Sequence, residues 1–145
     1  MGMAAAPANG NGEMRRMAYQ LAYYEAQAKD LQRQAALLQE GLEEVVSAKE
    51  ALKALEKSEG AVIFPLGGRV FVRAVPQKAG TVLADSGSGV IVEKTAQAAI
   101  ADLEANEKNL REGLARAQGQ LGQISQKASE LNAQAEELAR RAKQG

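Results

Sequence analysis

Two stretches of the chain repeat apolar residues at alternating spacings of three and four positions. The first run is Met14, Met17, Leu21, Tyr24, Ala28, Leu31, Ala35, Leu38, Leu42, Val45, Lys49 and Leu52. The second run is Ala96, Ile100, Leu103, Glu107, Leu110, Leu114, Ala117, Leu121, Ile124, Ala128, Leu131, Ala135, Leu138 and Ala142. Such a strict heptad repeat is typical of the contact seam of a coiled coil. It predicts helices over residues 13–58 and 95–143.

The two predicted helices have nearly equal lengths, and the segment between them must reverse the direction of the chain. Their seams also end at matching points, near Met14 and Ala142. We therefore expect the helices to pack on each other as an antiparallel pair within one chain. The alternative is that each helix pairs with a helix of another chain.

The register of this pair can be argued from side-chain size. In an antiparallel coil, the numbers of facing residues add up to a constant, and 152 and 159 both bring the ends together. A sum of 159 places Tyr24 on Ala135, so that a large residue meets a small one, whereas 152 leaves Ala35 on Ala117. We therefore expect 159.

Both seams contain one charged residue, Lys49 in the first and Glu107 in the second. In either register the two lie one layer apart. A polar pair in an apolar seam can fix the register at some cost in stability. Alternatively, both side chains extend to water where the coil frays.

The middle of the chain, residues 61–94, has a different pattern. "AVIFP" and "VFVRAV" flank "LGG", and "TVLAD" and "VIVEK" flank "SGSG". Short β-forming runs around glycine-rich turns predict two β-hairpins joined by residues 76–80. The expected fold class is α+β: a long antiparallel coiled-coil hairpin with two central β-hairpins that join an intersubunit β-barrel.

Two hairpins of this length cannot cover their own apolar faces, because an isolated hairpin is marginally stable in water. Exposed apolar strands also favour pairing with other strands at their edges. We therefore interpret residues 61–94 as an assembly module that other chains complete. The residues expected to form the assembly contact are Val62, Phe64, Val70, Phe71, Val72, Val82, Val90, Ile91 and Val92.

Composition narrows the function further. The 145 residues carry 18 basic and 18 acidic side chains, so no net charge favours nucleic acid or an anionic membrane. The absence of His and Cys removes the usual catalytic base and nucleophile, and we expect no enzyme, metal site or cofactor. Residues 1–12 are predicted to be a disordered leader without the features of a secretory signal, which favours a cytoplasmic protein.

At this point the chain resembles the α class of the prefoldin family. "PLGGRVFVRA" is similar to the first hairpin of that class, and "GSGVIVEKTAQAAI" to its second hairpin and the following helix. The resemblance implies an ATP-independent chaperone hexamer of two α and four prefoldin β subunits. It also implies that coiled-coil tips hold non-native protein clients and deliver them to a group II chaperonin.

The residues near the free end of the predicted coil fit such a role. Tyr19 and Tyr23 lie outside the seam, next to Met14 and Met17. Methionine adapts to irregular partners, and tyrosine combines a broad apolar surface with a polar end. The predicted client-binding residues are Met14, Met17, Tyr19, Leu21, Tyr23, Tyr24, Leu131 and Leu138. Alternatively, the seam residues only close the coil and both tyrosines are solvated.

Two other functions are compatible with this layout. One is a filament-forming structural relative with the same two hairpins. The other is a coiled-coil scaffold with a single fixed ligand.

Overall fold

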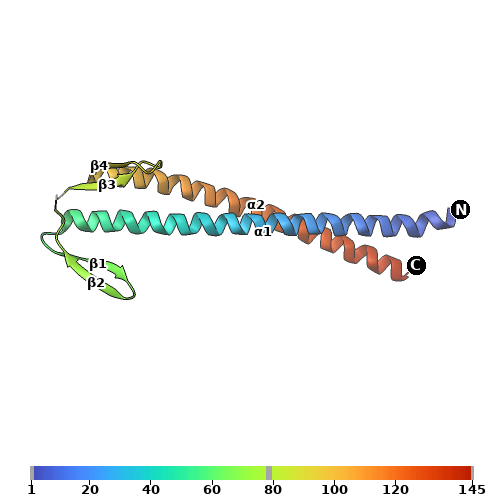
Figure 1. Ribbon diagram of the computed structural model, residues 1–145. Helices are drawn as coiled ribbons and strands as arrows, with labels where there is room; N and C mark the ends of the chain where they lie inside the picture. Colours follow the sequence, from blue (N-terminus) through green and yellow to red (C-terminus); the bar gives the residue numbers. More distant parts are fainter. Residues whose placement is uncertain (1, 78–79, 145) are drawn as a thin grey trace. The chain divides into compact units, whose positions relative to one another are not determined.

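The structure is a computed structural model that describes residues 2–77 and 80–144, with side chains from residue 11 onward. Two long helices and two antiparallel β-hairpins make up the chain, which confirms the predicted α+β class (Figure 1). The elements are α1 (Gly2–Lys57), β1 (Val62–Gly67), β2 (Val70–Ala74), β3 (Thr81–Asp85), β4 (Ile91–Thr95) and α2 (Ala96–Gln144).

The N-terminal end of α1 differs from the prediction. The helix begins at Gly2, whereas the heptad repeat predicted a start at residue 13; the disordered leader expected for residues 1–12 stays a prediction. Neither α1 nor α2, as far as they are described, is apolar enough over its length to cross a membrane.

The helices pack along the predicted seams. From residue 11 onward every seam position is buried or half-buried, except Met14 and Ala142 at the ends. The chain forms two compact units, one of residues 1–38 with 113–145 and the other of residues 39–112. In the first unit Ala117 and Leu131 are buried, and in the second Leu42, Val45, Ala96 and Ala99 are buried.

The register of the two helices differs from the sum of 159 that side-chain size predicted. A Cβ atom on Gly113 would lie 3.6 Å from both Cδ atoms of Leu38, and one on Gly41 would lie 3.7 Å from Leu110. The numbers of each pair add up to 151, which fits a sum of 152 and contradicts 159. The size argument considered only seam positions. It omitted the two glycines beside the seam, whose missing side chains leave room for a leucine of the facing helix.

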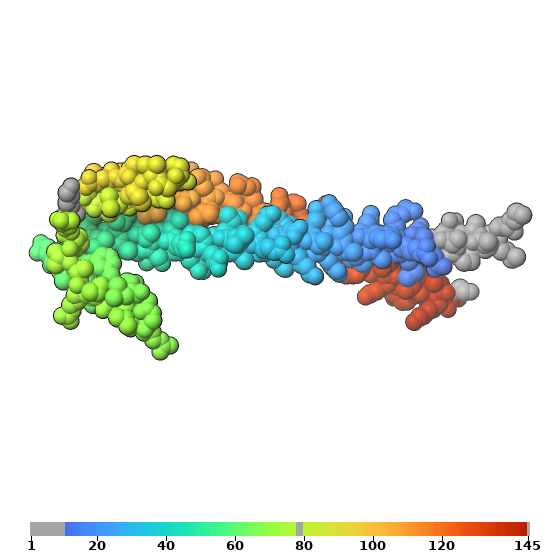
Figure 2. All heavy atoms as spheres, in the orientation of Figure 1, coloured from blue at the N-terminus to red at the C-terminus, as the bar shows by residue number. Residues whose placement is uncertain are grey.

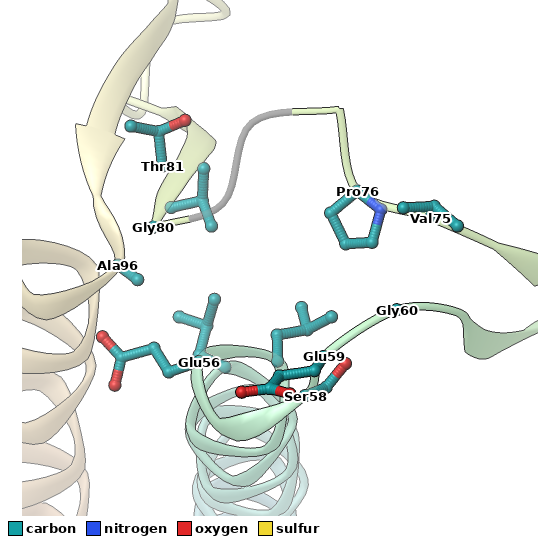
Figure 3. Close-up of a pocket in the computed structure, with 12 residues that line it drawn as sticks. Glu56, Ser58, Glu59, Gly60, Val75, Pro76, Gly80, Thr81 and Ala96 are labelled. Atoms are coloured by element: carbon teal, nitrogen blue, oxygen red, sulfur yellow. The ribbon is translucent and has the colours of Figure 1, made fainter.

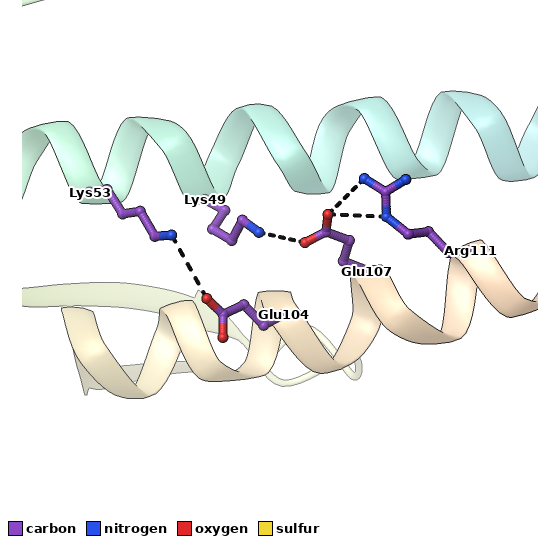
Figure 4. Close-up of polar contacts among 5 residues, drawn as sticks. All are labelled: Lys49, Lys53, Glu104, Glu107 and Arg111. Carbon is purple, nitrogen blue, oxygen red and sulfur yellow. Dashed lines mark hydrogen bonds and ion pairs between the residues drawn. The ribbon is translucent and has the colours of Figure 1, made fainter.

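The two charged seam residues form an ion pair inside the second unit. Lys49 Nζ lies 2.6 Å from Glu107 Oε2, and both side chains are largely buried, with 18% and 14% of their surface exposed. The other Glu107 oxygen, Oε1, accepts a hydrogen bond from Arg111 Nη2 at 2.9 Å (Figure 4). Lys49 above all, together with Arg111, holds the pKa of Glu107 below its usual value of 4.5.

The strands pair as the sequence predicts. β1 and β2 form one two-stranded sheet, and β3 and β4 form a second. The turn between β1 and β2 consists of Gly68 and Arg69, with φ angles of 58° and 64°. Positive φ at both central residues is the requirement of a type I′ turn, and its twist matches that of the strands.

The second hairpin is closed by side chain and backbone together. Asp85 Oδ1 accepts hydrogen bonds from the N–H groups of Gly87 and Gly89, at 2.9 and 3.2 Å. Thr95 Oγ1 then accepts a hydrogen bond from the N–H of Ala98 at 3.1 Å and caps the start of α2. The strand β4 therefore leads directly into a capped helix.

The register can be tested with a disulfide, because the chain contains no cysteine. We expect Leu38→Cys/Gly113→Cys to form an intrachain bond on mild oxidation, since these two side chains would be in contact. Leu38→Cys/Leu121→Cys, the matching pair for a sum of 159, serves as the control. Mass spectrometry without reductant measures both. Efficient bonding of the control pair alone would contradict the register.

The Glu107 ion pair predicts a pH dependence. Because the pKa of Glu107 is lowered in the folded chain, its stabilisation is present above pH 4.5 and is lost as the pH falls through the lowered value. We expect the thermal midpoint to decrease less between about pH 6 and about pH 3 in Glu107→Gln than in the unmodified chain. Circular dichroism measures this.

Glu104→Gln is the control for the pH experiment. Glu104 Oε1 lies 3.9 Å from Lys53 Nζ, and its side chain is about half exposed. An exposed pair at that distance contributes little to stability. Equal pH profiles of the two variants would refute the assignment to Glu107.

Candidate functional site

Exposed apolar side chains gather on the two hairpins. Ten of the fourteen large exposed apolar residues in the described part of the chain belong to residues 61–94. Figure 2 shows the atoms of the hairpins at the surface, in green and yellow. The other four lie on α1, and none lies on the described part of α2. The chain thus presents one apolar surface on its strands and a smaller one on α1.

The first hairpin is apolar on both faces. Phe64 lies opposite Val72 on one face, and Pro65 lies opposite Phe71 on the other. Phe64 and Val72 are each 41% exposed, whereas Phe71 is 62% exposed. A two-stranded sheet also leaves backbone groups unpaired along both outer edges. Faces and edges together are therefore available to strands of another chain.

The second hairpin has one face turned toward α2. Lys94, which lies on the same face as Val82 and Val92, forms an ion pair with Asp102 of α2 at 2.6 Å. Val82 and Val92 are half-buried. The opposite face carries Leu83, which is 74% exposed and pairs with Glu93, and it also carries Ile91. This outer face is open in the single chain.

The predicted assembly residues fall into two groups according to their exposure in the single chain. Val62, Val82 and Val92 are half-buried within the chain. The others are exposed, and they are Phe64, Val70, Phe71, Val72, Val90 and Ile91. The sequence analysis did not select four further exposed residues, which are Ile63, Leu66, Val75 and Leu83. Their alternation with the selected residues was the available signal, since successive side chains point to opposite faces of a strand.

The second surface lies near the N-terminal end of α1, within the first unit. Tyr19 and Tyr23 are 78% and 60% exposed, and Met14 is 39% exposed. The hydroxyl of Tyr23 accepts a hydrogen bond from Gln27 Nε2 at 2.9 Å, which orients its ring. The ring also lies beside that of Tyr24, with centroids 6.0 Å apart. The observed register places Met14 opposite Leu138.

The predicted client-binding residues are not all equally accessible. Leu131 is only 8% exposed and packs in the seam. Met17, Leu21, Tyr24 and Leu138 are half-buried. We therefore define the coil-end cluster as Met14, Met17, Tyr19, Tyr23 and Leu138, with the two tyrosines as its most exposed members. Leu37, at 63% exposed, lies further along α1 and was not predicted.

Both surfaces consist largely of exposed apolar side chains, which supply contact area for binding. Within the described residues, no three acidic side chains converge where a metal ion could bind. The apolar residues supply contact area, and the polar groups among them are tyrosine hydroxyls, arginines and carboxylates.

Comparison with known proteins agrees with this geometry. A family model described as "Prefoldin subunit" matches residues 24–141, which include both hairpins and most of both helices. The chain belongs to the prefoldin family. The resemblance noted from the hairpin strings is thereby confirmed.

Relatives from archaea support the α class. The chain is 35% identical over 121 residues to a prefoldin subunit alpha of Methanospirillum hungatei, with 78% of this chain and 81% of the relative covered. It is 28% identical over 134 residues to one of Pyrococcus horikoshii, with 90% of each chain covered. A solved chain of filamentous PFD from Methanocaldococcus jannaschii shares the fold, with a TM-score of 0.65 and 19% identity, covering 80% of this chain and 98% of that one.

Because the apolar side chains of the hairpins are exposed, replacing them should impair assembly without unfolding the chain. Phe71 and Val72 are exposed in the single chain, so replacing both with Ser should leave its helix content nearly unchanged. We expect Phe71→Ser/Val72→Ser to abolish oligomers with other prefoldin subunits, because polar groups would enter the apolar contact. Native mass spectrometry measures assembly.

Tyr19→Ser/Tyr23→Ser is the matched control, since it also removes two exposed apolar side chains, but from α1. This control should assemble normally. Assembly that survives the Phe71→Ser/Val72→Ser change would show that the hairpins are not the contact between subunits.

Proposed function

We propose that the chain is the α subunit of an ATP-independent prefoldin chaperone that holds non-native proteins at its coil ends and delivers them to a group II chaperonin. Membership of the prefoldin family supports a chaperone subunit that assembles with other prefoldin subunits. The proposed complex has two α and four β subunits and is cytoplasmic. The observation that carries the proposal is the separation of two apolar surfaces, one on the hairpins and one on α1.

The hairpins serve assembly in this proposal. Their apolar faces and unpaired edges would be covered by strands of neighbouring subunits, which join the hairpins into β-barrels. Burial of this surface would contribute about 25 cal/mol for each Å² removed from water. Once the hairpins are covered, the large exposed apolar side chains that remain among the described residues are those of the coil end and Leu37.

The coil-end cluster serves client binding. Each apolar side chain of the cluster can contribute on the order of 1 kcal/mol to a bound segment. That is weak for one coil, but several coil ends acting on one unfolded chain raise retention through effective concentration. The small size of each cluster also limits aggregation of the chaperone itself, because large contiguous apolar patches promote association.

A filament-forming structural protein is the second candidate, since the solved chain that shares this fold comes from a filamentous assembly. At 19% identity that likeness bears on the fold alone. Electron microscopy of the chain alone and mixed with a β-class subunit separates the candidates. Discrete particles in the mixture support the hexamer, and open-ended fibres from the chain alone support the filament.

Client holding should depend on the two exposed tyrosines. We expect Tyr19→Ser/Tyr23→Ser in the assembled complex to weaken the suppression of client aggregation several-fold, because each coil end loses two apolar contacts. Light scattering of an aggregating client measures this.

Leu37→Ser is the control, because Leu37 is equally exposed on α1 but lies outside the cluster. A complex that contains the Leu37→Ser chain should hold clients as well as the unmodified complex does. If Tyr19→Ser/Tyr23→Ser assemblies suppress aggregation as well as unmodified ones, the coil end is not the client site.

A further inference from the structure

A hollow of about 330 Å³ lies beside the C-terminal end of α1, inside the unit of residues 39–112. Its apolar walls come from α1, from the segment after β2 and from β3. The apolar side chains that line the hollow include Leu52, Leu55, Val75, Pro76 and Val82. Figure 3 shows the residues of the α1 end facing Pro76 and Thr81 across the hollow.

Among the described residues, the charged side chains that line this hollow are both acidic. They are Glu56, in the last turn of α1, and Glu59, two residues beyond the end of the helix at Lys57. Neither carboxylate has a hydrogen bond or an ion pair with another described residue. The hollow therefore combines an apolar wall with two negative charges that the described part of the chain does not neutralise.

The position of the hollow connects it with assembly. Val75 directly follows β2, and Thr81 and Val82 begin β3. The hollow therefore adjoins the open end of each hairpin, opposite its turn. A partner that covers the hairpins would also remove water from this place. Carboxylates that lose water without gaining a cation are strongly destabilising, so a stable contact requires a positive charge from the partner.

We propose that the hollow receives an arginine or lysine side chain from a partner prefoldin subunit. The methylene stem would lie on Leu55 and Val75, and the cationic end would lie between Glu56 and Glu59. Arginine and lysine suit such a place, because their stems cover apolar surface while the charge stays at the rim. This inference rests on the assembly that the proposed function requires, and it names the chemistry of the partner.

The test replaces both acids with Glu56→Gln/Glu59→Gln and uses Glu40→Gln/Glu43→Gln as the matched control. The control likewise changes two exposed acids three positions apart; both lie within α1, whereas Glu59 follows the end of that helix. Binding of the full chain to its partner subunit is measured at about 50 mM and about 500 mM NaCl, because salt screens ion pairs. We expect the first variant to bind about tenfold more weakly at low salt, with a much smaller difference at high salt.

Charge reversal then identifies the partner residue. Glu56→Lys/Glu59→Lys should bind more weakly still, and reversing one basic residue of the partner to Glu should restore binding. Equal affinities of the unmodified chain and the Glu56→Gln/Glu59→Gln variant at both salt concentrations would overturn the inference. It would also be overturned if the acids affected only self-association of this chain, since the occupant would then be a second copy.

Failure of this inference can be distinguished from failure of the proposed function. An unmodified chain that does not bind the partner at all would refute the assembly and the inference together. An unmodified chain that assembles and holds clients, with a Glu56→Gln/Glu59→Gln variant that behaves identically, would refute the inference alone.

Discussion

Among the described residues, the fully buried apolar side chains lie on α1 and α2, most of them in the seam between the two helices. The six buried ones, Leu42, Val45, Ala96, Ala99, Ala117 and Leu131, are all helical. A seam is one side chain deep on each helix, so it buries much less surface per residue than the core of a globular domain. The exposed apolar side chains of the hairpins remain available for contacts with other chains.

This constraint explains why the hairpins are so apolar although they are so exposed. Phe64, Phe71 and Leu83 would be misplaced on the surface of a protein that works as a monomer. They are understandable if the hairpins contribute only part of a sheet or barrel. The type I′ turn at Gly68 and Arg69 and the Asp85 turn hold each hairpin in shape without a core beneath it. The chain thus presents preformed strands to its partners and avoids the cost of ordering them on binding.

The sequence predicted the elements well because each is determined locally. Heptad spacing marked both helices, and glycine-rich turns between β-branched runs marked both hairpins. The register was predicted wrongly, because it depends on how the two helices meet at Gly41 and Gly113, outside the repeat that was analysed. The burial of Leu131 was also beyond the pattern. A seam leucine near a coil end can be exposed or buried, and the structure shows Leu131 buried, at 8% exposed.

Charge and apolar surface are arranged differently at the two candidate surfaces, and this difference is consistent with two kinds of partner. At the coil end the most exposed groups are tyrosines, whose rings accept many apolar shapes and whose hydroxyls can remain in water. A surface of this kind discriminates little, as promiscuous binding requires. Beside the hairpins, Glu56 and Glu59 stand at an apolar hollow. Two carboxylates in such a place penalise any partner that lacks a cation, and a fixed subunit contact needs that selectivity.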